Sequence, residues 1–153
     1  MEIILRLVKI YRSILKYFSI VIIFKNSTDR KDRKISKNIN YKVIKNNDDL
    51  KKIKFNNFQI PFSFSDRVKK KNQLHFISKK NDLISYGWSS NSSKFFISEV
   101  ESYHKNRNGV IFFDFRTLEK FQNKGYYKTL LYSMLRYFKF KNCFIYSLSS
   151  NKK

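Results

Sequence analysis

The sequence has no alanine, one cysteine, one proline, three glycines and two histidines in 153 residues. The single cysteine, Cys143, excludes an internal disulfide and any zinc site built from several cysteines. The two histidines, His75 and His104, leave few other ligands for a metal ion. We therefore expect a protein without a metal cofactor, whose fold depends on packing alone.

Acidic residues are also scarce, because 11 Asp and Glu stand against 33 Lys and Arg and leave a net charge of +22. A field of this sign attracts phosphates and anionic lipid headgroups. The absence of alanine beside abundant lysine, isoleucine and asparagine is typical of AT-rich codons, which explains part of the charge. Basic runs at Arg30 to Lys37 and Arg67 to Lys71 carry no nucleic-acid motif, so we expect no sequence-specific nucleic acid binding.

Long uncharged runs are missing as well. In residues 1–25, Arg6, Lys9, Arg12 and Lys16 recur at helical spacing and interrupt the apolar residues, so no run approaches the ~20 residues that span a bilayer. We predict an amphipathic helix followed by a strand in residues 1–25, and a charged linker in residues 26–38. Residues 1–17 either associate weakly with an anionic membrane surface or pack on the domain. We expect a cytoplasmic protein, peripheral to the inner face of the membrane in the first case.

Aromatic residues make up 18% of the chain and hydrophobic residues 42%, which is enough for one packed domain of this length. Residues 39–153 contain several strand patterns and two helix patterns. The expected strands are Ile39 to Ile44, Leu74 to Ser78, Leu83 to Trp88, Phe95 to Val100, Val110 to Thr117 and Cys143 to Leu148, and the expected helices are Asn47 to Ile53 and Lys128 to Phe138. An irregular segment is expected around Pro61. This order predicts a mixed α+β fold that ends in a βαβ unit.

The segment from Thr117 to Leu131 carries the clearest chemical signal. A strong strand ends there, a polar turn with Gly125 follows, and an amphipathic helix begins at once. Such a turn presents backbone N–H groups at a helix N-terminus, where the partial positive charge suits a phosphate. Lys120, Lys124 and Lys128 add side-chain charge to the same turn.

At these residues the sequence resembles the GNAT acyltransferase superfamily, whose pyrophosphate loop reads Arg or Gln, any, any, Gly, any, then Gly or Ala. Gln122 and Gly125 occupy two of these positions. The resemblance is closest to the bacterial branch with a Thr-Leu-Pro-Glu-Tyr-Arg-Gly-Lys-Gly loop, and it covers roughly Ile39 to the end of the chain. The matching residues are Thr117, Leu118, Phe121, Lys124, Gly125, Tyr127, Leu130 and Leu131, whereas Glu119, Gln122 and Asn123 replace proline, arginine and glycine.

The resemblance implies a mostly antiparallel central sheet flanked by helices, and acetyl-CoA as co-substrate. It further implies transfer of an acetyl group to a small-molecule amine, for example an amino sugar in surface polysaccharide synthesis. The residues that it assigns to acetyl-CoA are Thr117, Leu118, Gln122, Asn123, Lys124, Gly125, Tyr126, Tyr127 and Lys128. Asp114, Glu99 and Glu101 are the candidate bases that would remove the proton of the amine.

Two alternatives remain open at this point. In that family a helix and further strands follow the strand that corresponds to Cys143 to Leu148, so we expect residues 39–153 to be a domain incomplete at its C-terminus, with activity that the truncation could remove. The second alternative is a non-catalytic basic protein that binds nucleic acid or an anionic membrane.

Overall fold

The computed structural model describes residues 38–97, 102–105, 109–139 and 142–145. The predicted N-terminal helix and strand, nearly all of the linker, Glu99 and Glu101 therefore lie outside the described residues. In the part that is described, no helix is long and apolar enough to cross a membrane.

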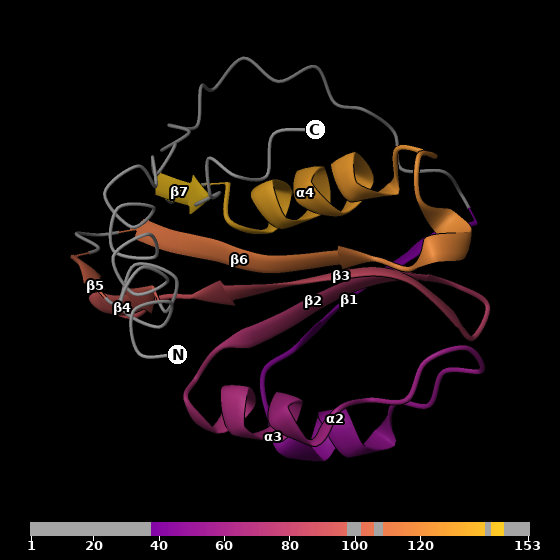
Figure 1. Ribbon diagram of the computed structural model, residues 1–153, viewed down its shortest axis with the longest axis horizontal. Helices are drawn as coiled ribbons and strands as arrows, with labels where there is room; N and C mark the ends of the chain where they lie inside the picture. The colour runs from indigo at the N-terminus through magenta and orange to yellow at the C-terminus, as the bar shows by residue number, and fades with distance from the viewer. Residues whose placement is uncertain (1–37, 98–101, 106–108, 140–141, 146–153) are drawn as a thin grey trace, which may run out of the picture.

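The centre of the molecule is a five-stranded sheet with the order β1-β2-β3-β6-β7 (Figure 1). Its neighbours pair antiparallel, except β6 and β7, which run parallel. The strands are β1 (Asn40–Ile44), β2 (Gln73–Lys79), β3 (Asp82–Ser90), β6 (Gly109–Thr117) and β7 (Asn142–Ile145). The separate pair β4 (Lys94–Ile97) and β5 (Ser102–Lys105) forms a small antiparallel sheet beside it. These pairings confirm a mixed α+β fold whose sheet is mostly antiparallel.

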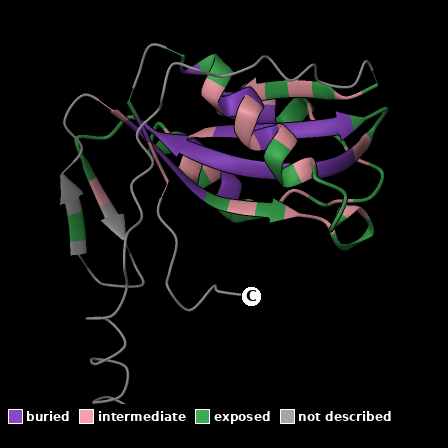
Figure 2. Cartoon of the chain, turned by 90° about the horizontal axis from the view of Figure 1, so that it is seen from above, coloured by how far each residue is buried: buried purple, intermediate pink, exposed green. Residues whose placement is uncertain are grey.

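Helices cover both faces of the sheet. The helix α4 (Tyr126–Tyr137) lies on one face, and α2 (Asn47–Lys52) and α3 (Phe62–Lys69) lie on the other (Figure 1). The short 3₁₀ helix η1 (Glu119–Phe121) precedes α4. Because both faces are covered, β2 and β3 are buried along almost their whole length, as Figure 2 shows.

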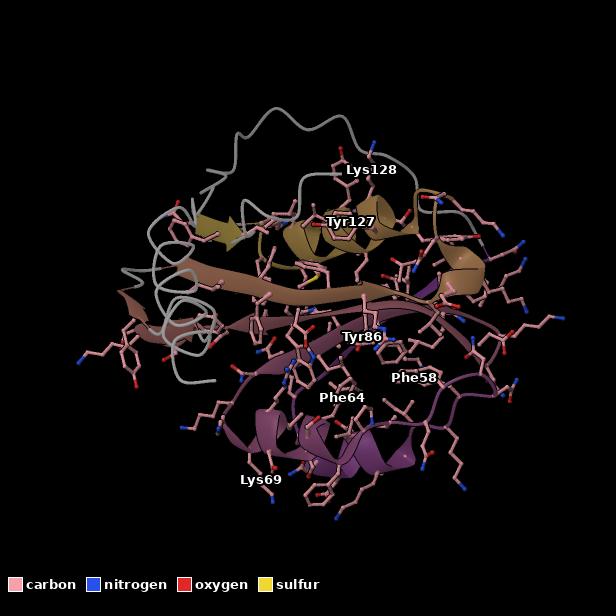
Figure 3. The ribbon with its side chains drawn as sticks, viewed as in Figure 1. Phe58, Phe64, Lys69, Tyr86, Tyr127 and Lys128 are labelled. Atoms are coloured by element: carbon pink, nitrogen blue, oxygen red, sulfur yellow. The ribbon has the colours of Figure 1, made fainter. Side chains whose placement is uncertain are left out.

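Two apolar cores follow from this layering. The core under α2 and α3 contains Ile44, Leu50, Phe64, Val68, Leu74, Phe76, Leu83, Tyr86, Trp88 and Phe113. The core under α4 contains Ile77, Ile84, Val110, Phe112, Leu130, Met134, Phe138 and Cys143. Phe64 fixes α3 to the sheet, because its ring lies 5.3 Å from that of Tyr86 and 5.0 Å from that of Trp88, centroid to centroid (Figure 3).

The structure differs from the sequence predictions in three places. Residues Phe62–Lys69 form the helix α3, where the sequence predicts an irregular segment around Pro61 and a basic run from Arg67. The side chain of Asn46 caps α2 by accepting from the Asp49 N–H at 2.8 Å, one residue before the predicted start. The strand β5, which contains His104, was not expected from the sequence.

Three hydrogen-bonded side chains, those of Tyr41, His75 and Ser89, form a polar row across the sheet beneath the end of α4. His75 is fully buried, with Nδ1 2.7 Å from the Tyr41 hydroxyl and Nε2 2.8 Å from the Ser89 hydroxyl. Burial, and secondarily the charge of Lys45, lowers the pKa of His75 to about 3. The ring is therefore neutral near pH 7, with one nitrogen donating and the other accepting, and the row is internally satisfied.

A β-bulge bends β6 at Asp114. Tyr86 pairs with Arg116, and Trp88 pairs with Phe113. An advance of two residues along β3 therefore corresponds to three residues along β6. Asp114 adopts φ +47°, in the left-handed region. Across from the bulge, the Phe115 ring lies 2.6 Å from where a Cβ on residue 87 would stand, so only glycine fits at Gly87.

We predict that Gly87→Ala destabilises the protein by about 1–3 kcal/mol, because the added methyl group overlaps the Phe115 ring in a packed region. Urea unfolding followed by circular dichroism measures this change. The matched control is Gly87→Ala combined with Phe115→Leu, in which the smaller side chain should make the two effects less than additive. Strict additivity would show that this contact does not exist.

Candidate functional site

The site begins where β6 ends. After Thr117, the Leu118 N–H donates to the Ile84 carbonyl at 3.0 Å and anchors the chain to β3. The 3₁₀ turn then closes, since the Gln122 N–H donates to the Glu119 carbonyl at 3.0 Å. The Gln122 side chain reaches back, and its Nε2 donates to the Thr117 carbonyl at 3.2 Å. These bonds fold residues 117–122 into a compact turn.

Two residues in the left-handed region connect this turn to α4. Asn123 has φ +58° and Gly125 has φ +77°. Asparagine is one of the few residues other than glycine that adopts this region readily, which explains how Asn123 stands where the resemblance expected glycine. Apart from its neighbours in the chain, no atom of the described residues lies within 4 Å of a Cβ built on Gly125, so the turn requires glycine there for its backbone conformation and not for space.

The N-terminus of α4 has no side-chain cap, because the N-cap residue is Gly125. The first helical hydrogen bond runs from the Thr129 N–H to the Gly125 carbonyl at 3.2 Å. The N–H groups of Tyr126, Tyr127 and Lys128 therefore have no acceptor among the described residues. Such free donors, together with the helix dipole, favour an anion at this position.

The residues that carry these donors line a surface hollow of about 390 Å³, here called the α4 hollow. It is lined by Thr117, Phe121, Gln122, Asn123, Gly125, Tyr126, Tyr127 and Lys128. Of the residues that the resemblance assigned to acetyl-CoA, Leu118 and Lys124 do not line it. Leu118 packs against the core, and the Lys124 ammonium donates to the Lys120 carbonyl at 3.0 Å. Phe121 lines the hollow but was not predicted, although it stands within the matched loop.

Aromatic side chains contact one another at the start of α4. The Tyr126 and Phe121 rings meet edge to face, 5.9 Å between centroids. Tyr127 meets Phe115 in the same way at 5.2 Å, which ties the start of α4 to the bulged strand. Burial raises the pKa of the Tyr127 hydroxyl, so this group stays protonated at neutral pH. Tyr127 and Lys128 are both labelled in Figure 3, on the α4 side of the sheet.

The candidate base Asp114 does not line the α4 hollow. Its carboxylate pairs with the Arg67 guanidinium of α3, on the opposite face of the sheet. That guanidinium also lies over the Trp88 ring, 5.3 Å from its centroid, and 5.9 Å from the centroid of Phe113. The other candidates, Glu99 and Glu101, lie outside the described residues. Sequence reasoning missed Arg67 as a partner, because no local pattern indicates a contact across 47 positions.

Comparisons with protein-family models, with curated proteins and with solved structures found no match. Among the residues that the structure describes, no three His, Cys, Asp or Glu side chains are grouped closely enough to hold a metal ion. The chemistry of this site therefore has to be inferred from its own geometry.

We predict that Asp114→Asn changes stability by less than about 1 kcal/mol, whereas Asp114→Val destabilises by about 1–3 kcal/mol. Asparagine keeps the left-handed conformation and loses only a partly exposed ion pair, whose contribution is small. Valine is strained at φ +47°. Thermal unfolding of the two variants measures the difference, and equal losses would mean that the ion pair, not the bulge, dominates at this position.

Proposed function

We propose that the protein is an acyltransferase that uses acetyl-CoA and transfers the acetyl group to an amine. The observation that carries this proposal is the uncapped N-terminus of α4, whose first residues line the α4 hollow shortly after the end of β6. The GNAT-like loop residues supply this turn, so the sequence resemblance and the hollow concern the same part of the chain. GNAT membership is part of the proposal.

In this proposal the pyrophosphate of the co-substrate accepts hydrogen bonds from the N–H groups of Tyr126, Tyr127 and Lys128. Three N–H donors at a helix N-terminus form a binding site for a diphosphate without any side-chain cap to displace. The ammonium groups of Lys120, Lys124 and Lys128 add positive charge to this turn, which suits the remaining phosphate of CoA. The thioester would extend from there along the second half of β6.

The acceptor amine must lose a proton as the acetyl group is transferred. Asp114 is the only proposed base within the described residues, and its carboxylate is engaged by Arg67. We propose that Asp114, held by Arg67, removes this proton through a bridging water or only orients the acceptor.

We expect the full-length protein to bind acetyl-CoA with one site, and Gly125→Val to weaken that binding at least about tenfold. Valine cannot adopt φ +77° without strain, so the free N–H groups lose their arrangement. Isothermal titration calorimetry measures the affinity. The matched control is Lys70→Gln, which removes a positive charge on the opposite face and should change affinity by less than about twofold. Absence of saturable binding, or equal affinity in Gly125→Val, would exclude the proposal.

A further inference from the structure

A second concavity lies on the other face of the sheet, between the edge strand β1, the end of β2 and the segment that follows α2. Its volume is about 480 Å³, and we call it the β1–α2 cavity. The lining residues are Lys42, Val43, Ile44, Asp49, Lys52, Ile53, Lys54, Phe55, Phe76, Ser78, Lys80 and Asn81. It shares no residue with the α4 hollow. The acyltransferase proposal leaves it without a role.

The charge around this cavity is unbalanced. Its acidic residue, Asp49, already pairs with Lys52, with 3.7 Å between the ammonium nitrogen and the carboxylate oxygen. The ammonium groups of Lys42, Lys54 and Lys80 have no acidic partner among the described residues. Three like charges around one concavity repel each other, and a bound anion relieves this repulsion. The cavity therefore favours an anionic ligand.

The walls of the cavity are held in place by hydrogen bonds between two distant segments. The Asn56 N–H donates to the Asn81 carbonyl at 3.1 Å. The Asn57 side chain bonds the backbone of Leu83 twice, accepting from its N–H at 2.8 Å and donating to its carbonyl at 2.9 Å. Lys54 lies two residues before Asn56, and Lys80 directly precedes Asn81, so the hydrogen bond between Asn56 and Asn81 keeps the backbones of the two lysines on neighbouring segments.

The backbone at Lys80 is unusual. It has φ +54° in the two-residue turn between β2 and β3, a position where glycine or asparagine is preferred. A lysine in the left-handed region costs roughly 1 kcal/mol or more. Lys80 lines the cavity in spite of this conformational cost.

The cavity also has an apolar floor. The ring of Phe55 packs edge to face on that of Phe76, with 5.1 Å between centroids. Ile44 and Phe76 are buried, while Phe55 and Ile53 remain half-buried and line the cavity. A simple inorganic anion would leave these apolar groups in contact with water. A ligand that joins an anionic group to an apolar or aromatic body would cover them.

We propose that the β1–α2 cavity binds a small phosphorylated molecule with an aromatic or apolar body, of which a nucleoside diphosphate is the simplest test case. Lys42, Lys54 and Lys80 hold the phosphates, and Phe55 and Ile53 contact the body. A volume of about 480 Å³ is within the range of small-molecule sites, roughly 300–1,000 Å³, which favours such a ligand over a nucleic acid strand or a peptide.

The test is calorimetric titration of the full-length protein with ADP and, separately, with inorganic phosphate. We expect ADP to bind at least about tenfold more tightly than phosphate. In the double variant Lys54→Gln/Lys80→Gln, ADP affinity should fall by about 3- to 30-fold, since each solvent-accessible ion pair contributes up to about fivefold. The matched control is Lys51→Gln/Lys70→Gln, which removes the same charge outside the cavity and should leave the affinity within about twofold.

Gly125→Val separates this proposal from the acyltransferase proposal. ADP carries the diphosphate that the α4 N–H groups are proposed to bind, and Gly125→Val weakens that competing site. The ADP binding that remains in Gly125→Val should therefore be the part that Lys54→Gln/Lys80→Gln weakens. Several results would overturn the inference. They are absence of ADP binding, equal loss of ADP affinity in the two lysine double variants, loss of ADP binding in Gly125→Val alone, and phosphate affinity equal to that of ADP. Preferential binding of oligothymidylate or an acidic peptide that is lost in Lys54→Gln/Lys80→Gln would assign the cavity to a macromolecule instead.

Discussion

The close approach of the Phe115 ring to Gly87 is the contact on which the rest of the site depends. The extra residue of β6 is accommodated here, so that Phe113 and Asp114 turn toward α3 while Phe115 turns toward α4. Phe115 then packs on Tyr127 and fixes where α4 begins. Because Gly87 on β3 has no Cβ, the Phe115 ring fits against it. The contact of this ring with Tyr127 then positions the free N–H groups of α4.

Six of the lysines in the described part of the chain lie at or beside the two concavities. Three lysines belong to the turn before α4 and its first residues, and three others surround the β1–α2 cavity on the opposite face. Both places combine positive charge with aromatic side chains. This combination suits ligands that contain both phosphate and an apolar body, and CoA and nucleoside phosphates share that chemistry. The two proposed sites differ in the groups that would hold the phosphates, which are backbone N–H donors at α4 and ammonium groups at the β1–α2 cavity.

The sequence predicts most of this sheet and α4, because β6 is a nearly unbroken apolar run and α4 has a clear helical period. The turn at Gly125 was also predictable, since glycine between a strand and a helix is a local signal. The bulge was not, because it depends on pairing with β3 and on the Phe115 ring. Helix α3 was missed because Pro61 and a cluster of charges conceal its two buried residues, Phe64 and Val68. The segments beside the β1–α2 cavity are joined by hydrogen bonds between Asn57 and Leu83, which are 26 positions apart. No local sequence pattern indicates such a contact.

The central claim is that the amides at the start of α4 bind the phosphates of acetyl-CoA. Titration of the isotope-labelled full-length protein with acetyl-CoA, followed by amide chemical shifts in NMR spectra, tests this most directly. The account predicts that the largest saturable shifts belong to the N–H groups of Gly125, Tyr126, Tyr127 and Lys128, with smaller shifts along the end of β6. Saturable shifts confined to the β1–α2 cavity, or no saturable shifts at all, would contradict it.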